Sequence, residues 1–455
     1  MTLGFSVVVF PLAPEFQWGE VGERLVREAD RVRRCLIRSA VIVLLGSAIA
    51  QTGMPAADAV AQNGAPVLKF GITGSDPTGD YTRVMSQLPV QEALLAIARE
   101  PRSREFIDLE LKGTSVSTDE LVRLHLIKPE NGSYRIAFNL LTRQDDQRVR
   151  DVTAKYARFL ADVILKRRSE LERLLSSYDL HSVKSSDLAY VLIGCFGLDW
   201  DGQDIALEEK YFTETKEPDY DPWAVEIGLP LTGIYWGSHN EYAKNARFTS
   251  FGDHQALPRM ALPDLIWRLS RATAKAELAP ELVKPSEAFA ESALSDLLEK
   301  TGAVMLALRS GPKSSAEIAS AVSLSQNELS SAFDLLTQLQ YVRHNGDRYE
   351  AIVPVLAAAD RPMVNSVRLL IWNAMDEWLH KYYDLLQSEL QGITPLKNGV
   401  SYREHVFLQV WHYIFGITNR DLVESGFFSS PYASERRYKG FIPMVWDPTL
   451  EKLMR

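Results

Sequence analysis

The chain has 455 residues, of which 46% are hydrophobic and 24% charged, as is usual for a globular protein of two to four domains. Its formal net charge of −9 argues against bulk binding of nucleic acid, because an acidic protein repels phosphate at long range. It has only two cysteines, Cys35 and Cys195, which excludes a scaffold built on disulfides.

Residues 1–61 read as an N-terminal extension followed by a signal peptide. A basic run from Arg31 to Arg38 precedes an apolar core from Ala40 to Ala50, and small residues follow as far as Ala61. This is the layout of a secretory signal, and the apolar core is shorter than the roughly 20 residues that span a bilayer. We therefore expect a periplasmic or extracellular protein with no stable membrane span after the signal is removed. A retained signal anchor and a buried helix of a cytoplasmic protein are the alternatives.

The stretch Arg33-Arg34-Cys35-Leu36-Ile37-Arg38 resembles the twin-arginine export signal. Adjacent arginines also occur in signals of the Sec pathway, so export by either the Tat or the Sec route is expected. Residues 62–82 are rich in Gly, Pro, Asp and Thr, which predicts a linker or arm.

Residues 83–212 predict a first unit of helices around one β-hairpin. Asn131-Gly132 supplies the positive φ angles that a tight hairpin turn requires, and Ser117 is a helix N-cap. The expected elements are helices over 90–99 and 104–111, a helix after Ser117, a hairpin over 126–140, a long helix over 149–178, and a helix over 186–196 that ends at Gly197.

Residues 292–455 repeat this order, with Asn345-Gly346 at the hairpin turn. The expected elements are helices over 301–309, 315–321 and 325–339, a hairpin over 341–353, a long helix over 364–390, and a helix over 402–415 that ends at Gly416. The repeated order predicts a tandem duplication and a mainly α fold with small β-hairpins (α+β). Residues 274–291, rich in Ala and Glu, are the expected connection between the copies.

Part of the second copy resembles the winged helix-turn-helix superfamily, in particular the ArsR and MarR types. The resemblance covers about residues 301–353, and more weakly about 90–140 in the first copy; no family accounts for the whole chain. It rests on an apolar first helix (Val304, Leu306, Leu308), on Ser315-Ala316-Glu317-Ile318-Ala319, Ser325-Gln326 and Leu335-Leu336, and on the Asn345-Gly346 wing.

The resemblance implies DNA reading by the third helix, with basic side chains on the phosphates. That helix, residues 325–339, has no Lys or Arg. Phosphate contacts dominate affinity for DNA, so the composition favours a winged helix used for structure or protein contact.

The densest polar and aromatic stretch, residues 233–267, lies between the copies within an expected hairpin segment over 213–273. Its candidate ligand-binding residues are Tyr235, Trp236, His239, Asn240, Asp253 and His254. His239, Asp253 and His254 are also candidate metal ligands, or a His–Asp pair that orients a general base. The alternative is a hairpin with structural histidines, its strands at Tyr235-Trp236 and 248–251.

Two further patterns have a chemical reading and a plainer structural one. Asp199, Asp201 and Asp204 have the close oxygen spacing of a calcium loop, although acidic turns after helices are common. Cys195 beside one of the histidines suggests a thiol hydrolase, but a free cysteine at the end of an apolar helix is usually a core residue. We assign no catalytic residue and predict no cofactor.

These patterns favour an exported, non-enzymatic binding or assembly protein with a protein or peptide partner. A cytoplasmic winged-helix transcriptional regulator is the first alternative. A hydrolase or metal-dependent enzyme that uses His239 or His254 is the second.

Overall fold

The computed structural model describes residues 66–74, 79–213, 220–228, 234–253, 295–436 and 439–454. The signal peptide, the expected connection over 274–291 and His254 lie outside the described residues, as does the side chain of His239. The chain divides into two compact units, Met1–Leu140 with Thr215–Ile227, and Leu141–Glu214 with Gly228–Arg455. This division differs from the expected boundaries, because it joins the second winged segment to both long helices.

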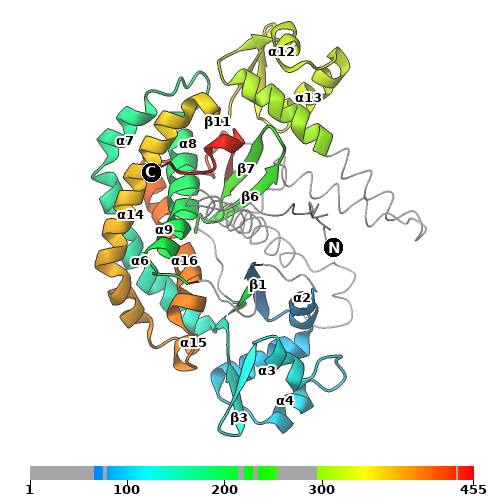
Figure 1. Ribbon diagram of the computed structural model, residues 1–455, viewed down its shortest axis with the longest axis vertical. Coiled ribbons are helices and arrows are strands. Elements are labelled where there is room, and N and C mark those ends of the chain that lie inside the picture. The colour runs from blue at the N-terminus through cyan, green and yellow to red at the C-terminus, as the bar shows by residue number, and fades with distance from the viewer. Residues whose placement is uncertain are drawn as a thin grey trace, which may run out of the picture. The chain divides into compact units, whose positions relative to one another are not determined.

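The first unit is a small α+β module (Figure 1). Its helices are α2 (Asp80–Met85), α3 (Leu88–Arg99), α4 (Arg104–Glu110) and α5 (Thr118–Arg123). Its strands are β1 (Leu68–Gly74), β2 (Ile127–Glu130), β3 (Ser133–Ile136), β4 (Asn139–Leu141) and β5 (Tyr220–Glu226).

The expected hairpin of this unit is confirmed. Strands β2 and β3 are antiparallel, with Glu130 opposite Ser133, and Asn131 and Gly132 have φ angles of 51° and 81°. Ser117 caps α5 by accepting from the N–H of Glu120. Residues 68–74, expected within a linker, instead form β1, which pairs with β5 in the sheet order β1-β5-β4.

The second unit holds the long helices. They are α6 (Arg143–Leu165), α7 (Arg168–Leu175), α8 (Ser185–Ala189), the π-helical segment η1 (Tyr190–Asp201), α9 (Gly202–Glu208), α14 (Arg361–Leu390), α15 (Thr394–Lys397), the π-helical segment η4 (Tyr402–Val406) and α16 (Phe407–Glu424). Helix α6 packs against α14 and α16, and α14 packs against η1, as Figure 1 shows.

Two helix ends expected at glycines are wrong. The helix that contains Gly197 continues from α8 through η1 into α9, and Gly416 lies inside α16. A Cβ on Gly197 would lie 2.7 Å from Ile371 Cγ2, and one on Gly416 would lie 2.5 Å from Ile234 Cγ2. Both glycines therefore permit close packing between elements and do not end helices.

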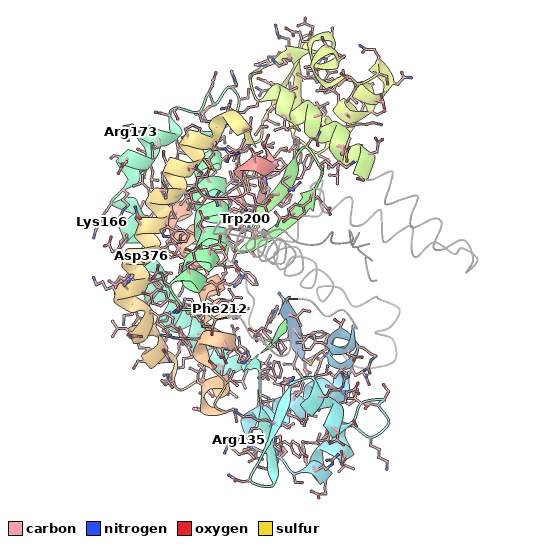
Figure 2. All side chains as sticks on the ribbon, in the orientation of Figure 1. Arg135, Lys166, Arg173, Trp200, Phe212 and Asp376 are labelled. Carbon is pink, nitrogen blue, oxygen red and sulfur yellow. The ribbon has the colours of Figure 1, made fainter. Side chains whose placement is uncertain are left out.

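The first long helix is also shorter than expected. In place of one helix over 149–178, α6 ends at Leu165 and α7 begins at Arg168. Arg167 has φ −98° and ψ 4°, outside the helical range, and its Nη1 donates to the carbonyl of Val163. Lys166 and Arg173, labelled in Figure 2, carry their side chains outward here.

The second winged segment belongs to the second unit. A helix over residues 295–308 is followed by β8 (Lys313–Ser314), α12 (Ser315–Val322), α13 (Gln326–Gln338), β9 (Val342–Asn345) and β10 (Arg348–Ala351). Ser314 and Ser325 cap α12 and α13 in complete capping boxes with Glu317 and Glu328.

A four-stranded sheet joins this segment to the helices, in the order β11-β12-β7-β6. Its strands are β6 (Gly237–Tyr242), β7 (Arg247–Gly252), β11 (Val355–Leu356) and β12 (Phe441–Trp446). Phe248 and Val445 belong to the same buried cluster as Leu336 and Tyr341 of the winged segment. The sheet and the segment therefore share one core.

Candidate functional site

The expected hairpin between the copies is present as β6 and β7. Its strands begin at Gly237 and Arg247, so Tyr235 and Trp236 precede β6 where a strand was expected. Trp236 is buried, with its ring centroid 5.0 Å from that of His412 on α16. Asn240 accepts a 2.6 Å hydrogen bond from Thr249 Oγ1 across the hairpin. In the structure, therefore, Trp236 packs in the core and Asn240 links the two strands of the hairpin.

Asp253 and Tyr235, two of the expected site residues, both contact Tyr432 at the end of β7. Asp253 is 3% exposed, and its Oδ2 accepts a 2.8 Å hydrogen bond from the hydroxyl of Tyr432. The Tyr432 ring lies beside Tyr235, with centroids 6.2 Å apart. The Asp253 N–H donates to the carbonyl of Gly440, 2.7 Å away. Tyr432 was missed because only the pairing of β12 with β7 brings its loop here.

The backbone of His239 pairs with that of Ser250. Ser250 is 1% exposed, and its hydroxyl has no hydrogen-bond partner among the described residues. Tyr190 on η1, whose ring contacts Phe251, has a fully buried hydroxyl that likewise finds no partner in the described part of the chain. A buried hydroxyl without a hydrogen bond costs stability.

Asp199, Asp201 and Asp204, expected in the loop of a calcium site, all lie in the continuous helix formed by η1 and α9. Asp201 makes a bidentate ion pair with Arg368, at 2.6 and 2.8 Å. Burial raises the pKa of Asp199 to about 8, although a hydrogen bond from Gln203 opposes the shift. Within the ranges that the structure describes, no three His, Cys, Asp or Glu side chains form a metal-binding group.

Cys195 is fully buried in η1, and burial raises the pKa of its thiol well above the usual value. A thiol nucleophile acts as the thiolate, which this environment disfavours. The side chain therefore belongs to the core, as its position in an apolar helix predicted.

A cleft of about 320 Å³ lies between the base of the second hairpin and the helices of the same unit. Such a volume lies at the lower end of the range for ligand pockets. Its lining residues come from the start of α8 and the residues just before it (182–187), from the end of α13 to β9 (339–343), from residues 352–353 after β10, from residues 435–436, and from Phe441 and Pro443 of β12.

The cleft has an apolar part and a charged rim. The apolar lining comes from Leu339, Tyr341, Ile352, Val353, Phe441 and Pro443. The ionised lining residues are Lys184, Arg343 and Arg436 against Asp187 and Glu435.

Ion pairs hold the rim in place. Lys184 pairs with Glu435 and, by donating a hydrogen bond, holds the pKa of that carboxyl at about 2. Arg436 pairs with the buried Asp187. Arg343 pairs with Glu350, whose pKa is lowered first by a hydrogen bond from Ser182 and then by Arg343. These ion pairs therefore fix the positions of the charged side chains around the cleft.

The exposed face of α13 is polar and almost uncharged. Its exposed side chains are Gln326, Asn327, Ser330, Ser331, Asp334, Thr337 and Gln338. The arginines of the hairpin that follows are engaged elsewhere, Arg343 with Glu350 and Arg348 with Glu317.

The arginines of the first unit are paired in the same way. Every arginine in the described part of that unit makes an ion pair, including Arg135 of the hairpin with Glu130 (Figure 2). The others are Arg83, Arg99, Arg102, Arg104 and Arg123. Helix α5, which precedes the hairpin of this unit, spans only six residues, or about 9 Å at 1.5 Å per residue.

Comparison with protein-family models, curated proteins and solved structures found no match for this chain. Among the residues described by the structure, no helix combines the length and apolar character needed to cross a membrane.

Proposed function

We propose that this chain is an exported, non-enzymatic binding or assembly protein built on two related winged-helix-like modules that contact protein. The observation that carries the proposal is the polar, nearly uncharged face of α13 beside a wing whose arginines are already paired. A surface that binds DNA needs cations free to replace the counterions of the phosphates.

Matching backbone contacts support the relation between the modules. In the first, the Leu126 N–H donates to Leu121 O and the Ala137 N–H to Leu126 O. In the second, the Tyr341 N–H donates to Leu336 O and the Ile352 N–H to Tyr341 O.

The residues that end the third helices also agree. His125 after α5 and Gln340 after α13 both have left-handed φ angles, of 56° and 59°. In each module, the segment ahead of the second helix pairs with a tyrosine of the hairpin: Arg102 with Tyr134, and Lys313 with Tyr349. These correspondences favour a duplicated unit over two hairpins formed independently.

The test combines a DNA measurement with a protein measurement. Fluorescence anisotropy of a labelled random duplex with the full chain should show no binding that weakens steeply between 50 and 200 mM salt. A photo-cross-linking amino acid at Ser331, on the exposed face of α13, should give a discrete protein adduct in expressing cells. The same probe at Glu170, exposed on α7, is the matched control.

Steeply salt-dependent DNA binding, or no adduct specific to Ser331, would overturn the binding proposal and favour the regulator. Export is tested separately, by the first residue of the mature protein. A start near Gln62 supports it, and a mature chain that begins at or before Arg31 contradicts it.

A further inference from the structure

Strand β12 is covered along only part of one edge. It pairs with β7 over its whole length, from Phe441 to Trp446, but with β11 only at Val445 and Trp446. The remaining part of that edge, at Phe441 and Pro443, has no neighbouring strand among the described residues. Uncovered strand edges are templates for pairing with another chain.

The hydrogen bonds that β12 makes show to which side its backbone N–H and C=O groups point. The N–H groups of Val445 and Asp447 donate to Pro354 and Leu356, at 3.0 and 2.8 Å, on the side away from β7. Because these groups alternate along a strand, Phe441 and Pro443 turn theirs to the same side. Proline has no N–H, so this edge offers the N–H and C=O of Phe441 and the C=O of Pro443.

The cleft opens at this part of the edge. Phe441 and Pro443 line it on one side, and Ile352 and Val353, just before β11, line it on the other. The cleft therefore lies where the chain that leads to β11 diverges from β12. Apolar side chains and an uncovered strand edge meet there, as they do in domains that bind a peptide by adding a strand.

The charges at the rim indicate the kind of segment that fits. Three cations and two acids line the cleft, which leaves an excess of one positive charge. The Lys184 and Arg343 side chains are 56% and 58% exposed, so both can face an incoming carboxylate. Lys184 can exchange its partner Glu435, which is 55% exposed, because such contacts are weak. Arg343 keeps its pair with Glu350, which is only 10% exposed, and its guanidinium has further N–H donors to offer.

We propose that the cleft binds an extended segment of a protein partner that carries an acidic side chain, as a short additional strand on β12. Main-chain bonds to Phe441 and Pro443 set its register, and its carboxylate faces Lys184 and Arg343. This inference rests on the proposed function as a protein-binding module, and it places a second contact surface away from the face of α13.

The probe is a library of random heptapeptides displayed on phage with flanking Gly-Ser linkers, selected on the full chain. We expect enriched peptides with an acidic residue next to apolar ones. The binding of a synthetic enriched peptide should weaken at least about tenfold in Lys184→Glu/Arg343→Glu, because like charges replace the attraction. Arg173→Glu, at an exposed position of α7 outside the cleft lining, should bind the peptide as the unsubstituted chain does.

The proposed main-chain hydrogen bonds to β12 can be tested separately. Methylation of single peptide nitrogens should weaken binding at alternate positions only, because alternate N–H groups face β12. No enrichment over the double charge variant, unchanged affinity in that variant, or a methylation scan without alternation would each overturn the inference. If the Ser331 adduct nevertheless forms, the failure concerns the cleft alone and leaves the proposed function standing.

Discussion

The ion pair between Arg368 on α14 and Asp201 on η1 should be the most sensitive polar contact in the second unit. Its side chains are 2% and 1% exposed, and two hydrogen bonds of 2.8 and 2.6 Å join them. Arg368 also donates to the carbonyls of Leu450 and Glu451, at 2.8 and 3.2 Å. One guanidinium thus joins two helices to the C-terminal segment.

Replacing Arg368 alone should lower the free energy of unfolding strongly. Arg368→Met removes the guanidinium that neutralises the buried Asp201 carboxylate, for which about 3–5 kcal/mol of lost stability is expected. The double variant Arg368→Met/Asp201→Leu removes both charges, and buried pairs replaced by apolar residues are often close to neutral. Because the carbonyls of Leu450 and Glu451 still lose their donor, about 1–3 kcal/mol of the cost should remain.

The assay is urea unfolding of the full chain, followed by far-UV circular dichroism and tryptophan fluorescence. A shift of the midpoint at constant slope reports a change in stability. Arg168→Met, which breaks the exposed pair of Arg168 with Glu172, is the control and should cost at most about 0.5 kcal/mol. A cost below about 1 kcal/mol for Arg368→Met, or a double variant less stable than the single one, would refute the reasoning.

Four further substitutions test other contacts of the second unit. Gly197→Ala should destabilise it by about 1–3 kcal/mol, because the new methyl group meets Ile371 Cγ2 at 2.7 Å. Asp199→Asn should stabilise it by up to about 5 kcal/mol at pH 7.5 and by less than about 1 kcal/mol at pH 4. The folded chain keeps this carboxyl protonated up to its pKa of about 8, whereas the unfolded chain ionises it near 3.8, so its stability contribution is lost as pH rises between these values. Tyr190→Phe should be neutral or stabilising because its hydroxyl has no partner, whereas Tyr413→Phe, which loses a 2.5 Å bond to a buried carboxylate, should cost about 1–3 kcal/mol.

The same unfolding assay checks each of these. If Gly197 lay on an exposed helical surface without a close neighbour, alanine there would instead stabilise by up to about 1 kcal/mol. Combining Gly197→Ala with Ile371→Ala should recover part of the loss. An equal effect of Asp199→Asn at both pH values would contradict the raised pKa. Equal costs for the two tyrosine variants would contradict the difference in their hydrogen bonding.

The sequence predicted best where the signal is local. The cap at Ser117 and the Asn-Gly turn at 131–132 act within a few residues, so their chemistry is visible in the chain itself. The winged elements follow from these signals.

The errors arise where a distant neighbour decides the structure. Glycine is common just after the last residue of a helix, so a helix was expected to end at Gly197. In the structure Gly197 lies inside a helix, where Ile371 packs so closely that a Cβ would not fit. Strand β1 lies in a segment that reads as a linker, because its partner β5 follows more than a hundred residues later. Tyr432 meets Asp253 across 179 positions of sequence, and no spacing rule predicts such a pair.

The shared core of the second winged segment gives the strongest reason to separate its fold from DNA reading. In a DNA reader the wing extends toward phosphates, but here Glu350 and Glu317 hold Arg343 and Arg348 back against the protein. Phe248 and Val445 bury the other side of the segment against the sheet, and this junction is also what leaves the edge of β12 beside a cleft. The packing that pairs both arginines of this hairpin with glutamates therefore also places the uncovered part of β12 beside the cleft, where the proposed peptide site can be tested.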